Sequence, residues 1–181
     1  MYQNSGIRYG IIAGIAVIAY FLLFYVIDRP LMLHVGVSWS SLLVYGTFMV
    51  LACQQLAKRQ PAADLKAYLK PAFTVFVIAN AAYYLFYYLL FNAIDPSMVE
   101  VQRGLLEATL ERYDSSLGDA VKKQLSEQIQ SDNFGVSFQD AFFGFAWSLI
   151  GGFVLALGVA FYFDRRKSVN LPIPNNGEPK L

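Results

Sequence analysis

Long apolar stretches alternate with polar ones along this chain, and their lengths indicate the structure it forms. Four stretches are long and apolar enough to predict membrane-spanning helices, at about residues 9–27, 37–56, 72–94 and 141–163. The first has about 19 residues, and a rise of 1.5 Å per residue makes it roughly 29 Å long, which matches a hydrocarbon core. We therefore expect an all-α, polytopic membrane protein with four transmembrane helices in two antiparallel hairpins.

The polar stretch 95–140, between the third and fourth spans, has a helical pattern of its own. Asp95 is placed to cap a helix, and Pro96 suits its first turn. An apolar arc follows at helical spacing and lies opposite glutamates: it contains Met98, Val99, Val101, Leu105, Leu106, Leu110 and Tyr113. A narrower stripe comes next, at Leu117, Val121, Leu125 and Ile129. The sequence predicts an amphipathic helical hairpin over 95–140.

The remaining segments are short. Residues 64–70 have apolar positions at helical spacing after Asp64, which favours a short interfacial helix, and Pro71 suits the first turn of the third span. No small-residue cleavage site follows the first span, so we expect an uncleaved signal anchor. Residues 168–181 are rich in Pro, Asn and Gly and predict a disordered tail, which leaves one four-span domain over 1–167.

Composition agrees with this prediction. The chain of 181 residues is 56% hydrophobic and only 15% charged, which is too apolar for an ordinary soluble domain. A basic face with interleaved aromatic residues is also missing from the polar segments, and this argues against nucleic-acid binding. The expected surroundings are therefore the lipid bilayer.

The distribution of charge predicts the orientation. The N-terminus, the 56–70 loop and the tail together carry nine basic and three acidic residues, a net charge of +6. The 28–36 loop and the 95–140 stretch carry five basic and ten acidic residues, a net charge of −5. Since excess Lys and Arg stay on the cytoplasmic side, we expect both termini in the cytoplasm of a bacterium and the amphipathic hairpin outside its inner membrane.

Small residues repeat every four positions in two of the spans and indicate where helices approach closely. The stripes contain Gly6, Gly10 and Gly14 in the first span, and Gly144, Ser148, Gly152, Ala156 and Ala160 in the fourth. Either the two stripes touch each other or one of them faces a second copy of the chain. Asn80, the one amide deep in the third span, is expected to face a neighbouring helix, because an unpartnered amide in hydrocarbon is costly.

No catalytic, cofactor-binding or metal-binding residues emerge from the sequence. His34 is the single histidine, without HxxH, CxxC or HExxH spacing around it. Glu100, Glu107 and Glu111 share a helical face, which is typical of a solvated side rather than a calcium loop. Cys53 lies in an apolar run and reads as a packing residue. The spans contain no Asp, Glu, Lys or Arg, so coupled transport is disfavoured, and we expect that the protein is not an enzyme.

Several fragments of this layout resemble a family of four-span bacterial membrane proteins of the Bacteroidetes type, described as a domain of unknown function. The fragments are Tyr9-Gly10-Ile11-Ile12-Ala13-Gly14, Lys70-Pro71-Ala72-Phe73, Ile94-Asp95-Pro96 and the Gly- and Ala-rich stretch from Ser148 to Ala156. The similarity covers nearly all of the chain up to Lys167. The resemblance implies a four-helix inner-membrane protein, and it does not imply any particular activity.

Two hypotheses for function remain. The first is a non-catalytic accessory or structural subunit, which contacts a membrane-protein partner or a second copy through the hairpin face made of Met98, Leu105, Leu106, Leu110 and Tyr113. The second is a lipid- or polyprenyl-handling protein, in which the Phe and Tyr side chains of the third and fourth spans line a groove.

Overall fold

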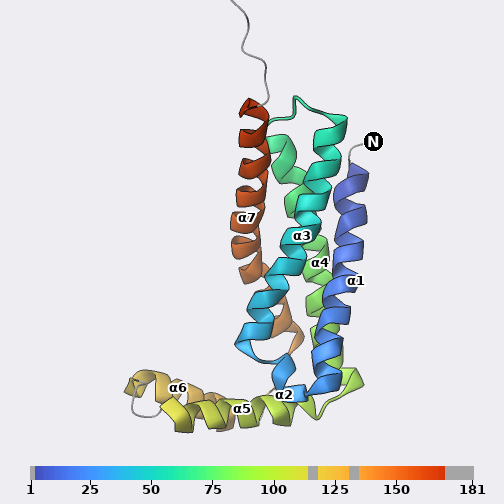
Figure 1. Cartoon of the computed structure of the whole chain (residues 1–181). Coiled ribbons are helices and arrows are strands. Elements are labelled where there is room, and N and C mark those ends of the chain that lie inside the picture. Colours follow the sequence, from blue (N-terminus) through green and yellow to red (C-terminus); the bar gives the residue numbers. More distant parts are fainter. Residues whose placement is uncertain (1–2, 114–117, 131–134, 170–181) are drawn as a thin grey trace, which may run out of the picture.

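The computed structural model describes residues 3–113, 118–130 and 135–169, and all the regular structure of these residues is helical (Figure 1). The elements in chain order are α1 (Gln3–Ile27), α2 (Arg29–Met32), α3 (Val35–Arg59), α4 (Leu65–Leu89), the π-helical turn η1 (Leu90–Ile94), α5 (Met98–Tyr113), α6 (Asp119–Gln130) and α7 (Phe138–Val169). The predicted all-α class is thereby confirmed.

Four helical segments are long and apolar enough to cross a membrane: Ser5–Ile27, Val35–Arg59, Leu65–Ile94 and Phe138–Arg166. They include the four predicted spans and extend them at their ends. In Figure 1 these helices run side by side as an elongated bundle, and α5 and α6 lie across one end of it. We refer to that end as the α5 end, and to the end with the N-terminus as the opposite end.

α4 is the central helix of the bundle and contacts α1, α3 and α7. The glycine stripe of α1 lies against it. A Cβ atom added at Gly10 would come within 2.9 Å of the Ile78 Cβ, and one added at Gly14 within 3.0 Å of the Ala82 Cβ. Because glycine has no side chain, the backbones of α1 and α4 can approach this closely, and dispersion attraction between them is stronger.

The small residues of α7 also face α4. A Cβ at Gly144 would lie 2.7 Å from the Tyr84 Cε1, and one at Gly152 would overlap the ring of Phe76. α1 and α7 make no contact within the described residues, so the expectation that their stripes touch each other is wrong. The reason is geometric: each stripe packs on a different side of α4, which separates the two helices.

The predicted interfacial helix over 64–70 is also wrong, since these residues are the first turns of α4. Asp64 caps α4, and its Oδ1 accepts a hydrogen bond of 2.9 Å from the Ala67 amide. Pro71 therefore lies inside the helix, where it has no N–H to donate to the Ala67 carbonyl. Tyr68 is only 2% exposed and its ring lies 5.7 Å from that of Phe163, so burial of this turn offsets the cost of the proline.

The α5 end is closed by short elements. α2 buries Met32, and η1 buries Leu90 and Phe91. The Asn92 amide donates hydrogen bonds of 2.9 Å to the carbonyls of Tyr88 and Val136, which ties the segment before α7 to the end of α4. α7 continues to Val169, two residues into the predicted tail, and the rest of that tail lies outside the described residues.

Candidate functional site

The junction between the bundle and α5 is built around the Asp95 carboxylate. Its Oδ2 accepts a hydrogen bond of 2.8 Å from the Tyr25 hydroxyl, and the Arg29 guanidinium lies 3.4 Å away. Its Oδ1 accepts from the Ser97 hydroxyl at 2.5 Å and from the Ser97 amide at 3.2 Å. One side chain thus joins the end of α1, the start of α2 and the turn that leads into α5.

These partners favour the charged form of Asp95. The Ser97 hydroxyl has the largest effect, followed by the Tyr25 hydroxyl and then the Arg29 charge, and together they lower the pKa of the Asp95 carboxyl. Both carboxylate oxygens are engaged, so this group is suited to anchoring rather than to nucleophilic or base chemistry. Sequence reasoning identified Asp95 only as a cap, because its partner Tyr25 lies 70 positions away along the chain.

The first turn of α5 belongs to the core of the bundle. Met98 is fully buried, and Val99 and Val101 pack against the core. α2 contacts α5. The inclusion of Met98 in an exposed partner face is therefore wrong, since its side chain belongs to the core cluster of the bundle.

Beyond Val101, α5 and α6 form what we call the arm, residues 102–113 and 119–130. Among the described residues, no apolar side chain of the arm is part of the core or packed against it. α6 contacts α5 and no other element of the described chain. Three leucines of the predicted partner face are only partly buried: Leu105, Leu106 and Leu110. The Tyr113 side chain lies outside the described part.

An aromatic recess opens between α4 and α7 near the α5 end. Its volume is about 150 Å³, and it is lined by Ala81, Tyr84, Leu85, Tyr88, Phe138, Ala141, Phe142 and Phe145. The ring of Tyr88 lies 6.0 Å from that of Phe138, and the ring of Tyr84 lies 6.2 Å from that of Phe145. Since ligand pockets usually exceed about 300 Å³, the recess has room for part of a hydrocarbon chain rather than for a whole ligand.

Two buried groups within the bundle, the Asn80 amide and the Cys53 thiol, have hydrogen-bond partners. The Asn80 amide donates a hydrogen bond of 2.5 Å to the Ser148 hydroxyl, which donates in turn to the Phe145 carbonyl at 2.6 Å. Asn80 is 4% exposed and therefore faces α7. The Cys53 thiol is buried and lies 3.5 Å from the Tyr68 carbonyl oxygen. These contacts support packing between the helices.

The residues considered for chemistry are not brought together. His34 caps α3, and its Nδ1 accepts a hydrogen bond of 3.1 Å from the Gly36 amide. In the described part of the chain, no three His, Cys, Asp or Glu side chains are grouped so that they could hold a metal ion. Glu107 and Glu111 lie exposed on the arm.

Comparison of the chain with known proteins shows which family it belongs to. No curated protein and no solved structure matches the chain. A family model described as "Protein of unknown function (DUF4199)" matches residues 8–165, from the first turns of α1 to the end of the fourth apolar segment. This match confirms the resemblance to a domain of unknown function. Since it covers most of the 181 residues, the chain belongs to the DUF4199 family.

Proposed function

We propose that this protein is a non-catalytic accessory subunit of a bacterial inner-membrane assembly, and that the arm binds a partner membrane protein outside the cytoplasm. The orientation follows from the net charges of +6 and −5 on the two sides of the predicted spans. The basic side, with both termini, is placed in the cytoplasm, and the acidic side, which includes the arm, outside.

The observation that carries the proposal is the way the arm leaves the bundle. The first turn of α5, which precedes the arm, is held by Met98 and by the Asp95 junction, whereas α6 contacts only α5 within the described chain. A helix held this way has little tertiary packing to stabilise it, and helices as short as α6, with 12 residues, are marginal alone in water. A partner that covers the arm would supply the missing contacts.

The chemistry of the arm favours a protein over lipid as that partner. Leu105, Leu106 and Leu110 are only partly buried, and full burial of each would contribute roughly 1.5–3 kcal/mol. Glu107 and Glu111 lie exposed on the same helix, and moving their carboxylates out of water to the hydrocarbon boundary would be costly. A protein surface can cover the leucines and leave the glutamates in water.

Site-specific photo-cross-linking in native membranes tests this. A photoreactive residue introduced at Leu106 should give one discrete adduct with a second protein, and the same residue at Thr109, which is exposed, should give little. Leu106→Glu with Leu110→Glu should abolish the adduct formed from a probe at Leu105. The control pair Ala108→Glu with Thr109→Glu adds the same charge at exposed positions and should preserve it.

We expect all these variants to insert into the membrane as the unmodified chain does, because the arm lies outside the four spans. An adduct that persists unchanged in the Leu106→Glu with Leu110→Glu variant would show that the leucine face does not bind the partner. Adducts only with lipid, or only between positions of the same chain, would also overturn the accessory-subunit proposal.

A second candidate function is handling of a lipid or polyprenyl chain, and the aromatic recess between α4 and α7 supports it. Phe138 and Phe142 are 68% and 56% exposed, so the recess is open to the surrounding hydrocarbon. Ala81→Trp would fill it, and Ala19→Trp on the exposed side of α1 is a matched control. Loss of a co-purifying lipid from the first variant alone would favour this candidate, and an unchanged lipid content would exclude the recess as its site.

A further inference from the structure

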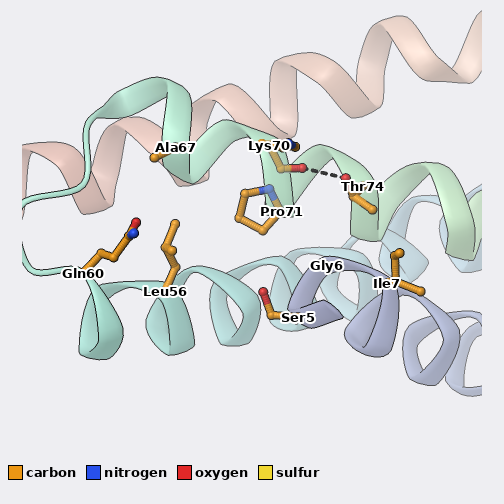
Figure 2. A pocket seen from close by; sticks show the side chains of 9 residues that line it. All are labelled: Ser5, Gly6, Ile7, Leu56, Gln60, Ala67, Lys70, Pro71 and Thr74. Carbon is orange, nitrogen blue, oxygen red and sulfur yellow. Dashed lines mark hydrogen bonds between the residues drawn. The ribbon is translucent and has the colours of Figure 1, made fainter. Parts of the chain in front are cut away.

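A pocket of about 350 Å³ lies at the opposite end of the bundle, far from the arm (Figure 2). The first turns of α1, the last turns of α3 and the first turns of α4 surround it. Nine residues line it: Ser5, Gly6, Ile7, Leu56, Gln60, Ala67, Lys70, Pro71 and Thr74. Its volume is within the range of ligand-binding pockets, and more than twice that of the aromatic recess, about 150 Å³.

The local sequence creates this space. Gly6 allows α1 to approach α4 closely, since a Cβ there would lie 3.1 Å from the Thr74 Cβ and 3.2 Å from the Pro71 Cα. Of the described residues of α1, only Gln3 to Ser5 lie beyond this contact, whereas α4 extends beyond it from Pro71 to Leu65. Figure 2 shows Ser5, Leu56 and Gln60 extending from the lower helices toward Ala67 and Pro71.

The lining has polar and apolar parts. Ser5 and Gln60 supply a hydroxyl and an amide, Lys70 lies at the edge of the pocket with its side chain exposed, and Ile7 and Leu56 are apolar. Thr74 is less available as a donor, because its hydroxyl donates a hydrogen bond of 2.8 Å to the Lys70 carbonyl. None of the nine lining residues is acidic. Such a lining matches an anion that is attached to an apolar group.

The surrounding charge favours an anion as well. Among residues whose side chains the structure describes, the acidic ones at this end are Asp64 and Asp164, and the basic ones are Arg8, Lys58, Arg59, Lys66, Lys70, Arg165 and Arg166. The Asp64 carboxylate already caps α4. The pocket lies at the ends of three membrane-spanning helices, which is the depth of lipid headgroups.

We propose that this pocket binds a phosphate group, carried either by an anionic membrane lipid or by a small soluble phosphate compound. The Lys70 ammonium supplies the charge, and Gln60 and Ser5 donate hydrogen bonds to the phosphate oxygens. Ile7 and Leu56 lie against the apolar part of a lipid ligand. This inference does not depend on the arm or on its partner.

Native mass spectrometry of the full chain in neutral detergent tests the proposal. With phosphatidylglycerol and phosphatidylcholine offered in turn, one molecule of phosphatidylglycerol should bind more tightly. Lys70→Gln should weaken that binding about tenfold, since a charge-assisted hydrogen bond is lost. Lys66→Gln removes the same charge one helical turn away, outside the lining, and should have little effect. Ala67→Leu fills the pocket without a change of charge and should abolish the bound lipid.

Each outcome decides between the alternatives. Displacement of phosphatidylglycerol by millimolar inorganic phosphate, or binding of inorganic phosphate alone, would assign the pocket to a soluble phosphate compound. Resistance to inorganic phosphate would assign it to a lipid. Equal weakening by Lys66→Gln and Lys70→Gln, equal binding of the two lipids, or no effect of Ala67→Leu would overturn the proposal, because binding would then reflect surface charge rather than this pocket.

Discussion

The contact between Gly152 and Phe76 provides a sharp test of how the bundle is packed. Gly152 is buried in α7, and a Cβ atom added to it would overlap the Phe76 ring. Gly151, its neighbour in the same helix, is exposed and has nothing within 4 Å of such an atom. Gly152→Ala and Gly151→Ala are therefore matched substitutions that differ in one respect, the space available for a methyl group.

The expected magnitude follows from the surroundings of Phe76. Its side chain is 3% exposed, and its ring lies 5.1 Å from that of Tyr45, which is also 3% exposed. Because Phe76 is buried beside the buried Tyr45, an added methyl group is expected either to shift α7 outward or to strain the core. Overpacking of this kind costs about 1–3 kcal/mol. Both alanines gain the same helix propensity, about 1 kcal/mol, which cancels in the comparison.

We expect Gly152→Ala to be less stable than Gly151→Ala by about 1–3 kcal/mol, measured as the free energy of unfolding when SDS is titrated into a mild detergent. In thermal unfolding this corresponds to a Tm difference of about 2–4 °C for each kcal/mol. Phe76→Leu should partly rescue Gly152→Ala, with a coupling energy of about 0.5–3 kcal/mol. Equal stability of the two alanine variants, or no coupling to Phe76→Leu, would refute this account of the α4–α7 contact.

Three further predictions concern the ends and the interior of the bundle. A cysteine introduced at Ser126 in a Cys53→Ala background should react with a membrane-impermeant maleimide on intact cells; labelling only after lysis would invert the proposed orientation. Ser148→Ala and Asn80→Leu should show a coupling energy of about 0.6 kcal/mol in a double-mutant cycle, with at most about 1.7 kcal/mol, because they share one interhelical hydrogen bond; no coupling would contradict that bond. The pKa of Asp95 is lowered in the folded protein, so its contribution to stability is present above the ordinary value of about 3.9 and is lost as the pH falls through the folded value. Tyr25→Phe removes one donor and should move the midpoint of this stability loss to higher pH. Hydrogen exchange at the start of α5 measures that midpoint, and an unchanged midpoint would refute the role of the Tyr25 hydroxyl.

Much of the fold could be predicted because it depends on local properties of the sequence. The length of an apolar run decides whether it can span a membrane, and all four spans were found this way. The cap at Asp64 is equally local. The prediction of an interfacial helix was wrong because Pro71 is also a local signal for a helix start. In the structure α4 continues through Pro71, and Tyr68 is buried beside Phe163 of α7.

The candidate site depends on contacts that no local pattern specifies. The sequence identifies Gly10 and Gly152 as positions of close approach, but a glycine stripe has the same appearance whether it faces α4, α7 or a second copy. What distinguishes these cases is the side chain opposite: Ile78 of α4 fits against Gly10, and Phe76 of α4 occupies the space that a side chain at Gly152 would need. α4 carries both of these larger residues and also Asn80. It is therefore the helix on which the others are arranged, and substitutions on it should disturb two interfaces at once.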